Sequence, residues 1–226
     1  SRNPKFLKTN MRTDLVIFDL DGTLLDTIGD LAVACNAMLA LRGLPGHSYA
    51  DYRGFVGNGI LRLVERALPE ELRTPEYVAA ARTDFVAYYI DHIDLHTVPY
   101  AGISELLDAL MQRGIRLAVA SNKFHAGTEK LVRRFFPGVS FDVVLGQRPD
   151  VPLKPDPTIV EEILDLTAVP RERVLYVGDS GIDMQTAAAA RIRSVGVTWG
   201  FRSREELQQA GAGVLVDRSE ELLRLL

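Results

Sequence analysis

Leu15-Val16-Ile17-Phe18-Asp19-Leu20-Asp21-Gly22-Thr23-Leu24-Leu25-Asp26 is the stretch that decides the fold of this chain. Its first four residues are apolar and rich in β-branched and aromatic types. Such a run is typical of a strand buried inside a parallel sheet. Two carboxylates, a glycine and a threonine follow the strand directly.

Asp19 and Asp21 are the first candidates for chemistry. Alternate side chains of an extended backbone share a face, so we expect the two carboxylates to project the same way. Carboxylates side by side repel each other, and a divalent metal ion is the simplest way to offset that charge. An Asp-Gly turn after a strand accounts for the same residues on conformational grounds alone. The remainder of the chain has to decide between the two interpretations.

Composition narrows the class of protein. The chain has 226 residues, 47% of them hydrophobic and 25% charged, which suits one large domain or a domain with a smaller insert. The net charge of -4, without a long basic run, argues against nucleic acid or an anionic membrane as the main partner. No apolar run approaches the ~20 residues that span a bilayer. A single cysteine, Cys35, cannot form an internal disulfide. We therefore expect a cytoplasmic protein.

The pattern of apolar residues divides the chain into three parts. Residues 1–10 lack periodicity and precede Met11, so they are expected to form a tail or a remnant of cloning. Residues 27–98 carry helical periodicity interrupted by glycine and proline, which predicts an all-helical unit of about four helices. From residue 99 onward helices and buried strands alternate, which predicts a parallel sheet covered on both faces.

The first strand belongs to the same sheet as residues 99–226, so the helical unit interrupts the sheet domain just after that strand. Polar residues follow three predicted strands, and these segments are Asp19 to Thr23, Ser121-Asn122 and Gly178-Asp179-Ser180 with Asp183. A fourth polar segment, Lys154-Pro155, opens a predicted helix. Each has an ordinary explanation as a helix cap or a solvated loop residue. Parallel strands bring their ends to one edge, however, and ligands bind at that edge in open α/β sheets. Their joint placement favours a site beneath a helical lid.

These four segments resemble the motifs of the haloacid dehalogenase superfamily, in its magnesium-dependent phosphatase branch. The layout is similar to that of the phosphoglycolate phosphatase-like group. The resemblance implies a Rossmann-like parallel sheet core at residues 11–26 and 99–226, flanked by helices, with an inserted all-helical cap at 27–98. It also implies a cytoplasmic hydrolase whose partner is a small phosphate monoester.

The resemblance assigns the chemistry to four residues. Asp19 would attack phosphorus and become an aspartyl phosphate, and Asp21 would protonate the leaving alkoxide and then activate water. Mg²⁺ would be held by the Asp19 carboxylate, the Asp21 main-chain carbonyl and the Asp179 carboxylate. The ammonium of Lys154 would help the metal to screen the repulsion between nucleophile and substrate.

Supporting roles are implied for five further residues. Ser121 and the Asn122 amide would hold the phosphoryl oxygens, and Thr23 would join this phosphate-binding set or orient Asp21 or the loop. Asp183 would orient Lys154 or a metal-bound water, with Ser180 beside it.

Three activities remain open, and two are disfavoured. Dehalogenases of this superfamily lack the second aspartate, which is present here as Asp21. Phosphonoacetaldehyde hydrolases need a cap lysine, and residues 27–98 contain none. A phosphatase is the preferred interpretation, with phosphoglycolate as the best guess for its substrate. A phosphomutase of the β-phosphoglucomutase type and a non-catalytic phosphometabolite-binding relative are the alternatives.

The segment Arg53-Gly54-Phe55-Val56-Gly57-Asn58-Gly59 is the one distinctive motif of the cap. It is either a flexible turn between helices or a loop that contacts the substrate through Arg53 or Asn58. An arginine would suit a carboxylate on the substrate.

Overall fold

The computed structural model describes residues 12–226, so the predicted tail at 1–10 and the start at Met11 lie outside the described residues. Within that range a six-stranded sheet forms in the order β5-β4-β1-β6-β7-β8, and every pairing in it is parallel. The strands are β1 (Leu15–Phe18), β4 (Arg116–Phe124), β5 (Val143–Gln147), β6 (Val174–Gly178), β7 (Arg193–Val197) and β8 (Val214–Val216).

Strand β1 is buried on both faces because all four of its side chains pack in the interior. Val16 and Phe18 belong to one apolar cluster, and Leu15 and Ile17 belong to another. This two-sided burial explains why the strand is continuously apolar rather than alternating.

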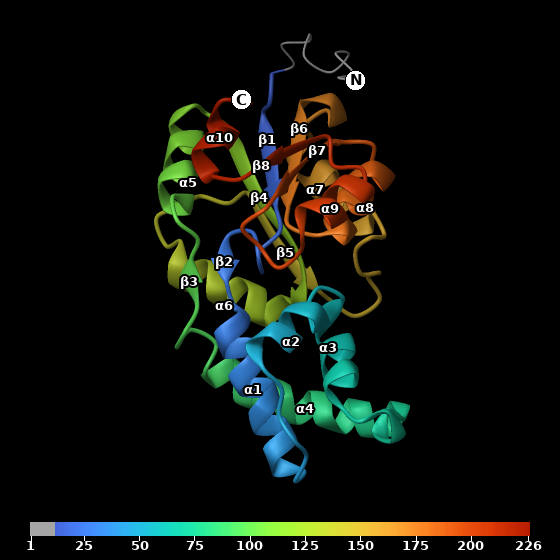
Figure 1. Cartoon of the computed structure of the whole chain (residues 1–226). Helices are drawn as coiled ribbons and strands as arrows, with labels where there is room; N and C mark the ends of the chain where they lie inside the picture. The colour runs from blue at the N-terminus through green and yellow to red at the C-terminus, as the bar shows by residue number, and fades with distance from the viewer. Residues whose placement is uncertain (1–11) are drawn as a thin grey trace.

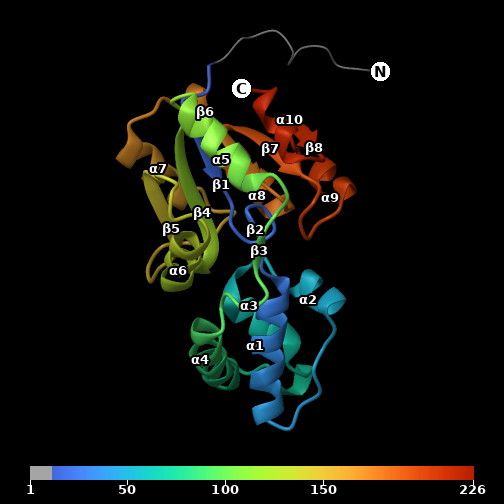
Figure 2. The same ribbon diagram turned by 90° about the vertical axis from the view of Figure 1, so that its left-hand side faces the viewer.

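Helices cover both faces of the sheet, as Figures 1 and 2 show. The first cluster is completed by α5 (Ile103–Gln112), α6 (His125–Phe135) and α10 (Ser219–Leu223). The second is completed by α7 (Thr158–Thr167) and α8 (Gly181–Ala189), with α9 (Arg204–Gln209) beside α8. A short 3₁₀ turn, η3 (Arg171–Arg173), precedes β6. The predicted parallel α/β fold is confirmed.

Residues 27–98, which we call the cap, contain α1 (Ile28–Leu41), α2 (Tyr49–Phe55), α3 (Gly59–Ala67), the 3₁₀ turn η2 (Glu70–Leu72) and α4 (Pro75–Asp91). Local signals explain two of the helix starts. Ser48 and Asp51 form a capping box at α2, and Thr74 caps α4 with Pro75 in its first turn. The cap lies beyond the carboxyl ends of β1 and β4 (Figure 2).

Two short strands link the cap to the sheet. β2 (Leu25–Asp26) and β3 (Val98–Pro99) pair antiparallel, so the chain enters and leaves the cap through neighbouring segments. The helical unit therefore lies over the sheet edge where the polar motifs gather.

Strand β4 extends beyond its apolar residues, which end at Ala120. It continues through the polar positions 121–123 to Phe124, and α6 begins at His125. The polar residues at 121–123 are buried in the strand. They remain there because distant groups satisfy them, among them the backbone at Lys154 and Gly57.

Candidate active site

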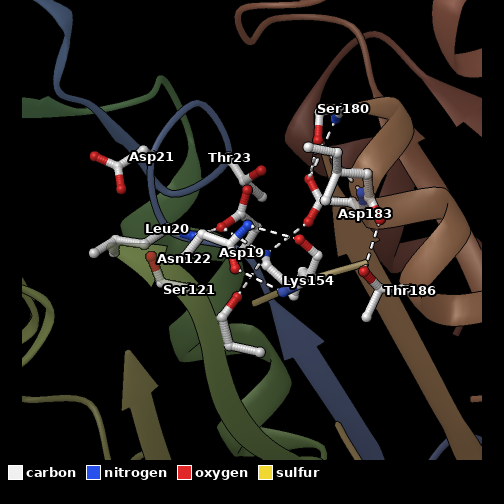
Figure 3. A network of polar contacts seen from close by, with 12 residues as sticks. Asp19, Leu20, Asp21, Thr23, Ser121, Asn122, Lys154, Ser180, Asp183 and Thr186 are labelled. Carbon is white, nitrogen blue, oxygen red and sulfur yellow. Dashed lines mark hydrogen bonds and ion pairs between the residues drawn. The ribbon is translucent and has the colours of Figure 1, made fainter. Parts of the chain in front are cut away.

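Lys154 is the centre of the polar network at the sheet edge (Figure 3). It lies in the loop between β5 and α7 and is 3% exposed. Its Nζ lies 2.8 Å from Asp183 Oδ1 and 3.1 Å from Asp19 Oδ1. The same ammonium donates to the carbonyl of Ala120 at 2.8 Å. A buried ammonium requires this number of partners, because an unpaired one would be strongly destabilising.

Asp183 is saturated with hydrogen-bond donors. Its Oδ1 accepts from Lys154 Nζ and from the Tyr176 hydroxyl at 2.8 Å. Its Oδ2 accepts from the backbone N–H groups of Asp179 and Ser180 at 3.1 and 3.2 Å and from the Ser180 hydroxyl at 3.0 Å. Burial opposes ionisation, but Lys154 and the hydrogen bonds outweigh it and lower the pKa of Asp183. Asp183 therefore forms a buried ion pair with Lys154, which is compatible with the first of its two predicted roles.

Asp19 and Asp179 are the two carboxylates with high affinity for a proton. Burial, followed by the charge of Asp183, raises the pKa of Asp19 well above its ordinary value and that of Asp179 to about 7. Asp19 Oδ1 accepts from the backbone N–H of Leu20 at 2.7 Å. Asp179 accepts from the Thr23 hydroxyl at 3.2 Å and from the backbone N–H of Phe201 at 2.9 Å. Negative charge is thus concentrated here at an energetic cost.

Backbone without side chains surrounds the Asp179 carboxylate. Gly22 has a φ of +83°, and a Cβ there would lie 2.1 Å from Asp179 Oδ2. A Cβ on Gly200 would lie 2.5 Å from the same oxygen. Both positions therefore require glycine for this close approach, and Gly22 requires it also for its left-handed backbone.

The donor set fits a divalent cation. Asp19, Asp179 and Asp183 each offer a carboxylate oxygen within 4.8 Å of the others. Lys154 compensates one of these charges, which leaves two buried carboxylates in excess. Oxygen-only ligation by carboxylates is what Mg²⁺ prefers. Because Asp183 is already occupied by donors, Asp19 and Asp179 are the side chains able to hold the ion.

Asp21 has its own partners. Its carboxylate points away from the Lys154 cluster in Figure 3, and its Oδ1 accepts from the Thr27 hydroxyl at 2.5 Å and lies 2.9 Å from Lys123 Nζ. β1 ends at Phe18, so the alternation of an extended strand does not govern the orientation of these residues. Both aspartates nevertheless line one cavity.

The Thr23 side chain contacts Asp179. It is fully buried, does not line the cavity and donates to Asp179 rather than to Asp21. Thr27, four residues later, donates to Asp21 instead. Direct orientation of Asp21 by Thr23 is therefore contradicted, whereas its expected roles in holding the loop or in the phosphate-binding set stay predictions.

Ser121 and Asn122 line the cavity but differ in availability. Asn122 Nδ2 donates to the carbonyls of Gly57 and Lys154 at 3.0 and 3.1 Å, and its Oδ1 accepts from the Lys154 backbone N–H at 2.9 Å. The side-chain amide of Asn122 is thus engaged within the protein, and binding of phosphate by the Asn122 amide stays a prediction. The Ser121 hydroxyl oxygen accepts from the Lys123 backbone N–H at 3.0 Å, and its own proton remains to be donated.

The cap contributes an apolar lining to the cavity. The cap residues that line it are Leu31, Val56, Gly57, Gly59, Ile60 and Leu63. Arg53 and Asn58 are absent from this lining, and contact of either residue with the substrate stays a prediction. Arg53 is exposed and its guanidinium carbon lies 5.8 Å from the centre of the Phe201 ring. Asn58 precedes the first residue of α3.

Sequence reasoning missed Lys123, Tyr176 and Arg202. Lys123 follows the predicted Ser121-Asn122 pair directly, and adjacency is the one signal that could have found it. Tyr176 stands in an apolar strand and resembles an ordinary core residue. Arg202 lines the cavity and donates to the Val56 carbonyl of the cap at 2.5 Å, a contact that no local pattern indicates.

The family model described as "Haloacid dehalogenase-like hydrolase" matches residues 16–197. Phosphoglycolate phosphatase of Pseudomonas syringae pv. tomato is 33% identical over 213 residues, covering 92% of this chain and 78% of the relative. A crystal structure from Lactobacillus delbrueckii subsp. bulgaricus, provisionally named a phosphoglycolate phosphatase, has a TM-score of 0.88 at 36% identity and covers 95% of this chain and 98% of its own. The structure of CbbY from Rhodobacter sphaeroides in complex with phosphate has a TM-score of 0.78 at 26% identity, with 93% and 96% covered.

Proposed function

Because this chain belongs to the haloacid dehalogenase-like hydrolases, we propose that it hydrolyses small phosphate monoesters through a phosphoenzyme formed on Asp19. The observation that carries the proposal is the clustering of Asp19 with Lys154 and Asp179 at the carboxyl ends of the central strands. This arrangement supplies an anionic nucleophile, a fixed cation beside it and a second carboxylate for a metal ion.

In the first step Asp19 attacks phosphorus, and the bond from phosphorus to the leaving oxygen breaks. Lys154 and the backbone N–H of Leu20 both contact Oδ1 of Asp19. Among the described residues Oδ2 receives no such donor, which makes it the attacking atom. The electron pair of the broken bond goes to the leaving oxygen, which takes a proton from Asp21.

In the second step water attacks phosphorus and gives a proton to Asp21, and the bond between phosphorus and Asp19 breaks. Asp19 leaves as a carboxylate and inorganic phosphate is released. The Ser121 hydroxyl donates to a phosphoryl oxygen in both steps, while Lys154, held by Asp183, keeps its charge beside the nucleophile.

Mg²⁺ is the proposed cofactor, held by the carboxylates of Asp19 and Asp179 and by the main-chain carbonyl of Asp21. When bound, it neutralises charge on the transferring phosphoryl group. Its support is the excess of buried carboxylates over ammonium groups and the raised pKa of Asp179.

Hydrolysis is favoured over the mutase alternative by the cap. A mutase has to hold a second phosphate group, and among the described residues no charged cap side chain lines the cavity. A small, singly phosphorylated substrate suits a cavity with an apolar cap lining. Phosphoglycolate is our best candidate because several relatives are named phosphoglycolate phosphatase. The complete set of acidic, basic and hydroxyl groups disfavours a non-catalytic phosphometabolite-binding relative.

We further propose that the protein acts in the cytoplasm on free metabolites. In residues 12–226 no helix has the length and apolar character needed to cross a bilayer.

Phosphate release from a panel of phosphate monoesters tests the proposal, with phosphoglycolate and sugar phosphates included. Release is expected with Mg²⁺, and its loss is expected with a chelator and in Asp19→Asn. A folded protein that releases phosphate from no monoester contradicts the proposed function. Interconversion of sugar phosphates without net release supports the mutase instead.

A further inference from the structure

Lys123 is a buried cation that joins the sheet to the cap. It lies on β4 and is 5% exposed. Its Nζ lies 2.9 Å from Asp21 Oδ1 and donates to the Tyr89 hydroxyl oxygen at 2.8 Å. Tyr89 is fully buried near the end of α4, so a single ammonium group contacts both the cap helix and the proposed acid–base residue.

The charge of Lys123 is maintained by these two partners. The Asp21 carboxylate at 2.9 Å and the Tyr89 hydroxyl at 2.8 Å compensate the buried ammonium. The ammonium also lies 4.7 Å from the centre of the Tyr89 ring, within the range of a cation–π interaction. Tyr89 therefore fixes the position of the Lys123 ammonium, and the ammonium in turn attracts the Asp21 carboxylate.

Aromatic packing within α4 and against the end of β4 sets the position of Tyr89. Its ring stacks on Phe85 of the same helix with a centroid distance of 5.3 Å. It also meets Phe124, at the end of β4, edge-on at 6.1 Å. A shift of α4 relative to the sheet would move the Tyr89 hydroxyl away from Lys123.

We propose that Lys123 and Tyr89 are positioning residues that align Asp21 for proton transfer when α4 is seated on the core. The inference rests on the proposed function, because it assumes that Asp21 protonates the leaving group. It makes the alignment of Asp21 depend on the cap, although no cap residue contacts Asp19 or Lys154 in this network. In phosphoenzyme formation, substrates whose leaving group needs a proton should depend on the Lys123–Tyr89 contact, and substrates with a stable leaving anion should not.

Tyr89→Phe tests this dependence because it removes one hydroxyl and retains the ring. Steady-state kinetics would compare phosphoglycolate, whose alkoxide needs a proton, with p-nitrophenyl phosphate, whose phenolate leaves unprotonated. We expect kcat/KM, which reports the steps through phosphoenzyme formation, to fall about tenfold for phosphoglycolate, as loss of one hydrogen bond to a charged group predicts. For p-nitrophenyl phosphate we expect kcat/KM to change less than about twofold, because Asp21 acts on that substrate only in the later hydrolysis of the phosphoenzyme. Lys123→Met should show the same dependence with a loss of about a hundredfold, the lower end of what acid–base catalysis contributes.

Two control variants alter similar groups without touching Asp21. Tyr88→Phe removes the hydroxyl of the preceding residue on α4, which stacks on His92. Lys130→Met removes another hydrogen bond from the core to α4, the one from Lys130 Nζ to the Ile90 carbonyl at 2.5 Å. Neither should produce a loss that depends on the leaving group.

An unchanged kcat/KM in Tyr89→Phe, or an equal loss of kcat/KM on both substrates, would overturn the inference while leaving the proposed function in place. Absence of phosphate release by the folded wild-type protein from every monoester of the panel would overturn the proposed function, and this inference with it. Because Tyr89→Phe is nearly isosteric, it keeps the test decisive if Lys123→Met fails to fold.

Discussion

Asp179→Asn separates the electrostatic cost of the site from its proposed metal-binding role. Asp179 is 2% exposed, and its burial together with the charge of Asp183 raises its pKa to about 7. In the unfolded chain the same carboxyl has a pKa of ~4. The folded state therefore holds this proton more tightly, so its stability is intact below about pH 4 and is lost as the pH rises through 7. A difference of about three pKa units corresponds to ~4 kcal/mol as an upper bound.

We expect Asp179→Asn to raise the free energy of unfolding at about pH 8 in a chelator, by up to ~4 kcal/mol, with little effect near pH 4. Saturating Mg²⁺ should reduce this difference in the free energy of unfolding between variant and wild type. It should stabilise the wild type by about 2.7 kcal/mol at a hundred times its Kd and the variant by much less. Urea unfolding followed by the fluorescence of Trp199, the single tryptophan, measures both quantities.

Asp183→Asn is the matched control, because it changes a carboxylate in the same cluster with the opposite electrostatic sign. The pKa of Asp183 is lowered, so its ionised form contributes stability above its ordinary pKa that is lost as the pH falls through the folded value. Removing this partner of Lys154 should cost about 3 kcal/mol at neutral pH, with or without metal. The reasoning is refuted if Asp179→Asn is less stable than the wild type in the chelator, or if Mg²⁺ stabilises both proteins equally.

Three further substitutions test separate parts of the site. Lys154→Met should abolish phosphate release and lower the free energy of unfolding by about 3–5 kcal/mol, as measured in urea, and a stable variant would contradict the buried ion pairs. Gly22→Ala should weaken Mg²⁺ binding in calorimetric titrations and cost about 1–3 kcal/mol, because its Cβ would collide with Asp179 Oδ2 at 2.1 Å. Unchanged metal affinity would show that this close approach does not matter. Arg202→Met removes the contact with the Val56 carbonyl of the cap, so KM should rise about tenfold with a smaller change in kcat. A loss confined to kcat would count against a role in seating the cap.

The α/β architecture could be predicted because its signals are local. Four apolar residues before Asp19 indicate a buried strand, and the alternation of strands and helices after residue 99 indicates a parallel sheet. The polar strand ends then follow from topology, since parallel strands bring their ends to one edge. This is why the approximate location of Ser121, Lys154 and Asp179 was predictable without coordinates.

The partners of individual side chains were not predictable, because they are chosen by tertiary contacts. Thr23 lies two residues after Asp21 and Thr27 lies six, yet the turn at Gly22 directs the nearer hydroxyl to Asp179 and leaves the farther one to Asp21. From the sequence alone Lys123 resembles an ordinary loop lysine, because its partner Tyr89 lies 34 positions earlier. The apolar lining of the cap likewise depends on which helix faces turn toward the sheet.

A phosphoenzyme on Asp19 is the intermediate that distinguishes nucleophilic attack by Asp19 from direct attack of water on the substrate. The protein would be quenched in acid during turnover of a phosphate monoester with Mg²⁺, digested, and analysed by peptide mass spectrometry. We predict the mass of one phosphoryl group on the peptide that contains Asp19, and none in Asp19→Asn. Turnover without a phosphorylated Asp19 peptide, or a phosphoryl group on another residue, would show that Asp19 is not the nucleophile.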